Sequence, residues 1–161
     1  MIDIPDEAIT KGTPIAPIEI QQCIEKSASK HSVDQTLLQI IIETENGKKG
    51  TVRYNKSNGS HDLGPAQINT IQFEENWFQK EYPNVTWQKL SSDVCLNIDV
   101  AGRVFKQRIS ELKPSQSIWN AVGNYHSKTH KYKLRYLQKV MKAYRVRAQE
   151  QGEGYRVSWL K

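Results

Sequence analysis

Two glutamates, Glu43 and Glu45, end the most apolar stretch of the chain and are its first candidates for acid–base chemistry. On a helix, residues two positions apart point about 200° away from each other, so only one of these carboxyls can continue an apolar face. Ile41 and Ile42 precede Glu45 by four and three residues, which places Glu45 on that face. A desolvated carboxyl has a raised pKa, as a general acid near neutral pH requires. The alternative is that Glu45 only marks the solvent-exposed end of the helix.

Two polar segments downstream could complete a site around such a carboxyl. Directly after Glu45 come Asn46 and Gly47, and a longer segment then reads Asn58-Gly-Ser-His-Asp-Leu-Gly-Pro-Ala-Gln-Ile-Asn69. The second segment reads Ala121-Val-Gly-Asn-Tyr-His-Ser127.

The elements that must position these residues are mostly helices. Apolar spacing predicts six helices. Three of them cover residues 17–30, 70–80 and 129–149. The other three begin at residues 32–34 and end just before 47, begin at 92 or 93 and end near 109, and begin at 114–115. Ser32 and Gln35 have the spacing of a capping box. The Asn58-Gly59 turn predicts an antiparallel ribbon over residues 51–68. The fold class is therefore mainly α (α+β), with a small hairpin inserted after the helix that ends at Glu45.

Length and composition favour one globular domain. The chain has 161 residues, of which 37% are hydrophobic and 25% charged, values typical of a folded domain that does not cross a membrane. Residues 1–16 are expected to be a flexible N-terminal lead-in, residues 17–149 the domain, and residues 150–161 a C-terminal tail. We expect the domain to be a monomer.

The net charge of +6 is concentrated near the C-terminus. Residues 126–161 hold ten Lys or Arg against Glu150 and Glu153. Such a basic segment could meet nucleic acid, anionic lipid or an acidic polymer, or could be a solvated helix face. Because no nucleic-acid recognition motif accompanies it, we expect no nucleic-acid partner.

The two cysteines, Cys23 and Cys95, could be free buried thiols or one disulfide. The chain has no Cys-x-x-Cys pair, and His31, His126 and His130 do not form a metal-binding pattern, so we expect no metal. The N-terminus shows no basic or apolar leader segment. The chain is therefore cytosolic, or it has lost a secretion signal and gained a start Met.

Taken in order and spacing, these motifs resemble the lytic transglycosylases of the soluble-lysozyme-like (SLT) type. In that family an apolar helix ends in Glu-Ser-Gly, a hairpin follows with Asn-Gly-Ser-Tyr-Asp-Leu-Gly-Pro-Met-Gln-Ile-Asn, and a later helix carries Tyr-His-Ser or Tyr-Asn-Ala-Gly. The resemblance runs from about Cys23 to Tyr144. It is strongest to the small members that serve conjugation, type III and type IV secretion and pilus systems. It implies a lysozyme-like fold.

Carried over residue by residue, the resemblance makes Glu45 the catalytic acid and base. Gln67 and Tyr125 match groove residues of the family, and the weaker candidates for sugar contacts are Asn69, Asn55 and Ser127. Small members often pair a Cys before the catalytic helix with one in an Asp-x-Cys-x-Asn stretch. The residues Asp93 to Asn97 fit that stretch, which favours a Cys23–Cys95 disulfide.

Three residues depart from the family pattern. Asn46 stands where Ser is usual, which exchanges one hydrogen-bonding side chain for another. His61 stands where Tyr is common, and we interpret it as an exposed loop side chain. Ala66 replaces the usual Met, which would remove a flexible apolar wall beside the groove and weaken substrate binding.

The resemblance implies a cofactor-free cleavage of peptidoglycan in the bacterial periplasm or cell envelope, with the secretion signal removed. The bond cleaved would be the β-1,4 bond between N-acetylmuramic acid and N-acetylglucosamine, leaving a 1,6-anhydro sugar. Asp62 lies in the hairpin and is interpreted as a turn-stabilising residue. The resemblance implies that a single carboxylate, that of Glu45, carries the reaction. The partners implied are glycan strands and components of a secretion or conjugation apparatus. A hydrolytic lysozyme and a non-catalytic peptidoglycan-binding module are the alternatives.

Overall fold

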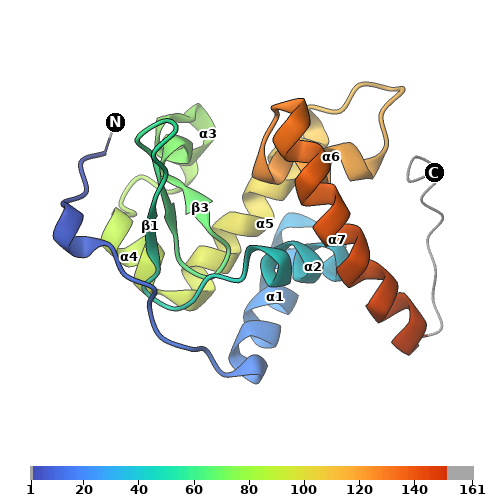
Figure 1. The fold of residues 1–161 in the computed structure, drawn as a ribbon, viewed down its shortest axis with the longest axis horizontal. Helices are drawn as coiled ribbons and strands as arrows, with labels where there is room; N and C mark the ends of the chain where they lie inside the picture. Colours follow the sequence, from blue (N-terminus) through green and yellow to red (C-terminus); the bar gives the residue numbers. More distant parts are fainter. Residues whose placement is uncertain (1, 152–161) are drawn as a thin grey trace.

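The computed structural model describes residues 2–151, which form helices and one small sheet that lies on one side of the molecule (Figure 1). The helices are α1 (Pro17–His31), α2 (Gln35–Glu45), α3 (Asn76–Glu81), α4 (Trp87–Ser92), α5 (Val94–Ser110), α6 (Ile118–His126) and α7 (His130–Gln151). The antiparallel sheet has the strand order β1 (Val52–Tyr54), β2 (His61–Leu63), β3 (Ile68–Asn69). Short 3-10 helices are η1 (Asp6–Ala8) and η2 (Thr70–Glu74). The predicted mainly α fold with an inserted antiparallel ribbon is confirmed.

Helix α5 runs between the two halves of the molecule (Figure 1). On one side, α1, α4 and the sheet enclose a core that includes Ile24, Leu63 and Ile98. On the other side, α2, α6 and α7 enclose a second core that includes Ile40 and Val122. Helix α2 lies between these cores, because Leu38 and Ile42 belong to the first and Leu37, Ile40 and Ile41 to the second.

The start of α2 differs in detail from the capping box expected at Ser32 and Gln35. Ser32 takes a left-handed conformation with φ 54° and ends α1 instead. The N-cap of α2 is Asp34, whose carboxylate accepts a 2.9 Å hydrogen bond from the Leu37 N–H. An aspartate there satisfies a backbone donor that the helix itself cannot pair.

The ribbon and the segment after it also refine the expected pattern. Leu63 pairs with both Val52 and Ile68, so β2 is the central strand of three. The helix predicted over residues 70–80 is two elements, η2 and α3, because Glu75 has extended backbone angles between them. The short helix α4 was not predicted, and its N-cap is Thr86.

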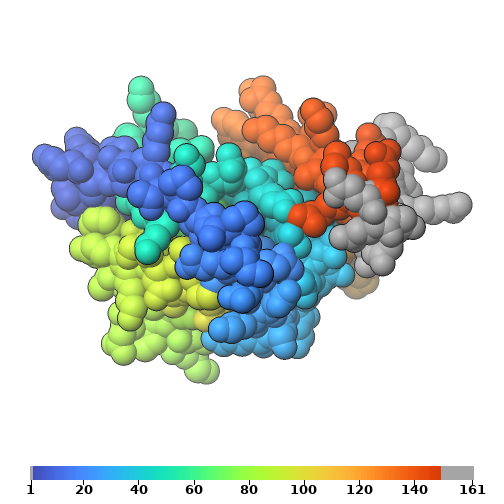
Figure 2. Space-filling view, turned by 90° about the horizontal axis from the view of Figure 1, so that it is seen from below, coloured from blue at the N-terminus to red at the C-terminus, as the bar shows by residue number. Residues whose placement is uncertain are grey.

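Residues 2–16, for which composition predicts a flexible lead-in, lie along the sheet in the structure. Thr10 forms a β-bridge with Val52 and Thr13 forms one with Lys49, so this segment pairs with the open edge of β1. Ile4 is 5% exposed and belongs to the core beside the sheet. Figure 2 shows the segment in dark blue along the outside of the molecule. This pairing satisfies free N–H and C=O groups at the exposed edge of the strand.

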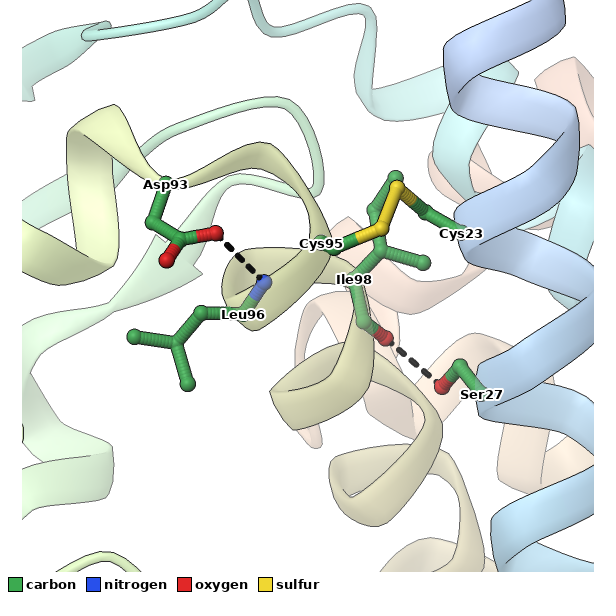
Figure 3. Close-up of a disulfide and its surroundings, with 6 residues drawn as sticks. All are labelled: Cys23, Ser27, Asp93, Cys95, Leu96 and Ile98. Atoms are coloured by element: carbon green, nitrogen blue, oxygen red, sulfur yellow. Dashed lines mark hydrogen bonds between the residues drawn. A yellow bond between two sulfur atoms is a disulfide. The ribbon is translucent and has the colours of Figure 1, made fainter.

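The predicted disulfide is present between Cys23 of α1 and Cys95 in the first turn of α5, with their Cα atoms 4.9 Å apart (Figure 3). Asp93 caps α5 by accepting a 3.0 Å hydrogen bond from the Leu96 N–H. One turn further along, the Ser27 hydroxyl donates a 2.8 Å hydrogen bond to the Ile98 carbonyl. The disulfide and this hydrogen bond together hold α1 against α5.

The last helix ends the described chain. α7 reaches Gln151, so most of the predicted tail of residues 150–161 lies outside the described residues. The exposed side chains of α7 include Lys131, Arg135, Lys139, Lys142 and Arg145. Within residues 2–151, no helix has the length and apolar character needed to span a membrane.

Candidate active site

A groove of about 590 Å³ lies between the sheet side of the molecule and the junction of α6 with α7. Its lining includes every residue that the sequence predicts for the site, namely Glu45, Asn55, Gln67, Asn69, Tyr125 and Ser127. These residues come from α2, from the sheet and its loops, and from α6 and its C-terminal end. The fold therefore brings segments 80 residues apart in the chain, such as Glu45 and Tyr125, into one concave surface.

Glu45 is the buried carboxyl of this groove. Its side chain is 9% exposed, and its Oε1 atom makes no hydrogen bond of normal geometry within the described part of the chain. Burial raises the pKa of Glu45 above its ordinary value, while the neighbouring His126 lowers it and the negative charge of Asp62 raises it. A carboxyl held protonated toward neutral pH is able to donate a proton to a substrate.

Glu43 has a different environment, as the helix geometry predicts. It forms an ion pair with Arg147 of α7, and its side chain is 43% exposed. This ion pair joins α2 to α7 at the surface, and Glu43 is not among the residues that line the groove. The two glutamates are therefore separated in role by their position around the helix.

The backbone directly after Glu45 contacts the loop that precedes Gln67. Asn46 takes a left-handed conformation with φ 54°, which ends the helix and is tolerated by asparagine. The next N–H, of Gly47, donates a 3.1 Å hydrogen bond to the Pro65 carbonyl. A Cβ atom at Gly47 would overlap with the Gly64 carbonyl oxygen, so only glycine allows this approach.

Gln67 lies at the turn between β2 and β3 and has an unusual backbone. Its φ angle is 52°, a left-handed conformation that is uncommon for residues other than glycine. Its side-chain Nε2 donates a 3.0 Å hydrogen bond to the Gly64 carbonyl, and the residue is 9% exposed. The side-chain amide is thus held in one orientation at the groove wall.

Tyr125 connects α6 to the same loop. Its hydroxyl donates a 2.9 Å hydrogen bond to the Ala66 carbonyl. Burial raises the pKa of Tyr125 well above its ordinary value, with contributions from the charges of Glu45 and Asp62. The hydroxyl is therefore a hydrogen-bond donor at all working pH values.

Ala66, which stands where Met is usual in the family, is not among the residues that line the groove. Its side chain is fully buried in the core, and its N–H donates a 2.8 Å hydrogen bond to Asn97. The effect of this replacement on substrate binding stays a prediction.

Asp62, Asn55 and Asn69 form a hydrogen-bonded group on the sheet side of the groove. Asp62 accepts hydrogen bonds on one carboxylate oxygen from Asn55 at 3.1 Å and on the other from Asn69 at 2.9 Å. Both amides also donate to the Ser60 hydroxyl. Asp62 thus stabilises the hairpin, as predicted, but it also lines the groove and acts electrostatically on Glu45.

His61 is also placed differently from the exposed loop position expected for it. It lies in β2, is 6% exposed, and its ring centroid is 5.2 Å from that of Tyr54.

Two residues next to Glu45 were not predicted for the site. His126, at the end of α6, places its Nδ1 atom 3.5 Å from Glu45 Oε1. Its ring stacks on that of Tyr136 of α7, with centroids 4.6 Å apart and planes 1° from parallel. In the sequence, His126 belongs to the Tyr-His-Ser motif, which does not indicate how close it lies to Glu45. Tyr136 is buried, and the apolar spacing of α7 predicts a core position for it but no contact with Glu45.

Comparison with known proteins agrees with the geometry of the groove. Residues 22–145 match the family described as the Transglycosylase SLT domain. A comparison with curated proteins finds no match. The family match covers about three quarters of the chain and contains the whole groove lining, including Glu45 and Tyr132 at its ends in the sequence. Because the family model covers residues 22–145, the chain belongs to the SLT family of lytic transglycosylases, which are glycan-cleaving lyases that act on peptidoglycan in the cell envelope.

Proposed function

We propose that this enzyme cleaves the β-1,4 bond between N-acetylmuramic acid and N-acetylglucosamine, with Glu45 as the acid and then the base. The observation that carries the proposal is the environment of Glu45, a 9% exposed carboxyl on the lining of an open groove. Burial raises its pKa, so the carboxyl keeps a proton to give to a glycosidic oxygen.

The reaction proceeds in two proton transfers on one carboxyl. Protonated Glu45 donates to the glycosidic oxygen, the bond to the anomeric carbon breaks, and the acetamido group of the substrate stabilises the positive charge. The Glu45 carboxylate then removes the proton of the muramic acid C6 hydroxyl, and that oxygen bonds to the anomeric carbon. The product is a 1,6-anhydro sugar, and Glu45 is protonated again without water or a cofactor.

The other predicted site residues bind and orient the glycan. Gln67 presents an amide held by Gly64, and Tyr125 fixes the loop that carries Gln67. Asn55, Asn69 and Ser127 supply further polar groups along the groove for sugar hydroxyl and acetamido groups. Holding the C6 hydroxyl near the anomeric carbon contributes to the rate through proximity.

A hydrolytic lysozyme reaction is the second candidate, and Asp62 is the observation that favours it. Its two oxygens accept hydrogen bonds from Asn55 and Asn69, which hold the side chain in one orientation at the groove wall. A buried carboxyl and a hydrogen-bonded carboxylate in one groove are the pair that two-carboxylate glycosidases use. In that reaction water, rather than the C6 hydroxyl, would complete the cleavage.

We further infer that the enzyme acts in the periplasm and opens the wall locally for a secretion or conjugation apparatus. The Tyr-His-Ser motif at residues 125–127 and the Asp-x-Cys-x-Asn stretch at residues 93–97 support this role by resemblance. The Cys23–Cys95 disulfide is consistent with it, because disulfides persist in oxidising compartments.

The test is mass spectrometry of the soluble products released from purified peptidoglycan by the wild type, Glu45→Gln and Glu43→Gln. We expect anhydro-muropeptides from the wild type and from Glu43→Gln, and none from Glu45→Gln. Glu43→Gln is a matched control because it makes the same change two residues away on the other side of α2. No products from the wild type would favour a non-catalytic peptidoglycan-binding module.

Asp62→Asn separates the two reactions. Products with free reducing ends from the wild type, lost in Asp62→Asn, would establish hydrolysis with two carboxylates. Anhydro products that persist in Asp62→Asn would establish that Glu45 acts alone.

A further inference from the structure

The imidazole of His126 faces the buried oxygen of Glu45. Its Nδ1 atom lies 3.5 Å from Glu45 Oε1, longer than an ordinary hydrogen bond but within direct electrostatic contact. This oxygen makes no hydrogen bond of normal geometry within residues 2–151. His126 and Tyr136 are the two titratable side chains that act on this carboxyl at hydrogen-bonding range, and His126 is the histidine of the pair.

Tyr136 holds the imidazole in this position. The two rings are stacked with centroids 4.6 Å apart and planes 1° from parallel. Tyr136 is 5% exposed, so its ring is fixed by the packing of α7. The side chain of His126 is 39% exposed, so the imidazole also reaches the groove and its solvent.

The other charged and titratable groups around this pair come from each neighbouring element. Asp62 of β2 acts on Glu45 through its negative charge, and Tyr125 of α6 and Tyr136 of α7 are neutral because their pKa values are raised. The cation after α6, Lys128, is paired with Glu111. Among the side-chain types named here, histidine is the one whose charge ordinarily changes near neutral pH.

We propose that His126 is a positioning residue that controls how long Glu45 keeps its proton as the pH rises, and so determines the pH range in which the enzyme cleaves glycan. The proposal rests on the proposed function of Glu45 and deepens it. A protonated imidazole at 3.5 Å favours the carboxylate, whereas a neutral imidazole leaves the proton on the carboxyl.

Because Glu45 and His126 lie in direct electrostatic contact, we expect each to change the titration of the other. When the pair holds a single proton, that proton is on Glu45 in some molecules and on His126 in the others. Only the molecules with protonated Glu45 can act as the acid. The fraction of protonated Glu45 therefore rises in two overlapping steps as the pH falls. Without a titratable neighbour, it rises in a single step centred at higher pH.

The first experiment measures Glu45 directly in the substrate-free protein. Carbon-13 NMR follows the side-chain carboxyl, which is assigned by its disappearance in Glu45→Gln, in the wild type, His126→Gln and His126→Lys. We expect the titration midpoint of Glu45 to rise by about one pH unit in His126→Gln and to fall in His126→Lys, which carries a fixed cation. Identical midpoints in all three proteins would overturn the proposal.

The second experiment compares pH profiles of kcat/KM on peptidoglycan. The basic limb should move to higher pH in His126→Gln and to lower pH in His126→Lys, and should not move in His130→Gln, a nearby exposed histidine outside the groove lining. A rate that falls by one factor at every pH would show a structural role only and would overturn the proposal. If the wild type releases no products while the NMR midpoints shift as expected, the proposed function fails and the coupling of His126 to Glu45 stands.

Discussion

The hydroxyl of Tyr125 donates a 2.9 Å hydrogen bond to the carbonyl of Ala66, and this contact ties α6 to the loop that presents Gln67. Residues from the two halves of the groove are thereby held at a defined separation. The alignment of a long glycan in the groove depends on that separation.

Tyr125→Phe removes this hydrogen bond and leaves the Ala66 carbonyl without its partner. We expect a loss of about 1–2 kcal/mol in the free energy of unfolding and a fall of roughly tenfold in kcat/KM. Chemical denaturation and product release from peptidoglycan measure the two effects. Tyr54→Phe, at a 44% exposed ring, is the matched control and should change neither quantity. An unchanged rate in Tyr125→Phe would show that the loop is positioned without this bond.

Gly47→Ala tests the close approach of α2 to the loop before Gln67. The added methyl group meets the Gly64 carbonyl, so the end of α2 must shift, with a cost of about 2 kcal/mol and a large loss of activity. Gly50→Ala is the control, because it has a φ of 84° and nothing within 4 Å. It costs about 1 kcal/mol from backbone strain alone and should leave the activity unchanged. Equal activities in the two variants would contradict the role of this contact.

Glu45 should make the folded protein less stable as the pH rises. Burial raises its pKa in the folded state, so the folded state holds the proton over a pH window in which the unfolded chain has released it. Stability is then lost as the pH rises from the unfolded pKa, about 4.3, through the raised folded pKa. Glu45→Gln lacks this penalty, so its Tm relative to the wild type should increase across that window. A Tm difference independent of pH, measured by calorimetry, would contradict the burial of an ionisable carboxyl.

The Cys23–Cys95 disulfide closes a loop of 72 residues. Its removal should lower the free energy of unfolding by about 4 kcal/mol, because the reduced unfolded chain gains conformational freedom. Urea unfolding of the wild type with and without a reductant measures this difference. The double variant Cys23→Ser and Cys95→Ser should match the reduced wild type and should not respond to the reductant.

The cations on the exposed side of α7 should attract the anionic cell wall. Lys139→Glu together with Lys142→Glu should weaken binding to peptidoglycan that carries stem peptides by about tenfold at low salt, and less at high salt. Lys89→Glu together with Lys106→Glu changes the net charge equally at exposed positions of α4 and α5 and serves as the control. Equal losses in the two double variants would assign the effect to net charge alone.

Several elements could be predicted from local pattern because their cause is local. α1 begins at Pro17 as predicted, since proline suits the first helical position, and α2 ends at Glu45 before a left-handed Asn46. Elements without a strong apolar pattern were missed or misjudged. The break at Glu75 and the short helix α4 are examples, because tertiary packing decides short segments.

The sequence by itself determined which glutamate faces the protein interior, because the offsets from Ile41 and Ile42 define one side of α2. It also determined the motif order that identifies the family. Only the tertiary structure decided that His126, Tyr136 and Asp62 surround Glu45. These groups come from α6, α7 and β2, and periodicity describes the faces of a single element but not which faces of different elements meet. Their effect on the carboxyl depends on distance and burial, which arise only when the chain is packed.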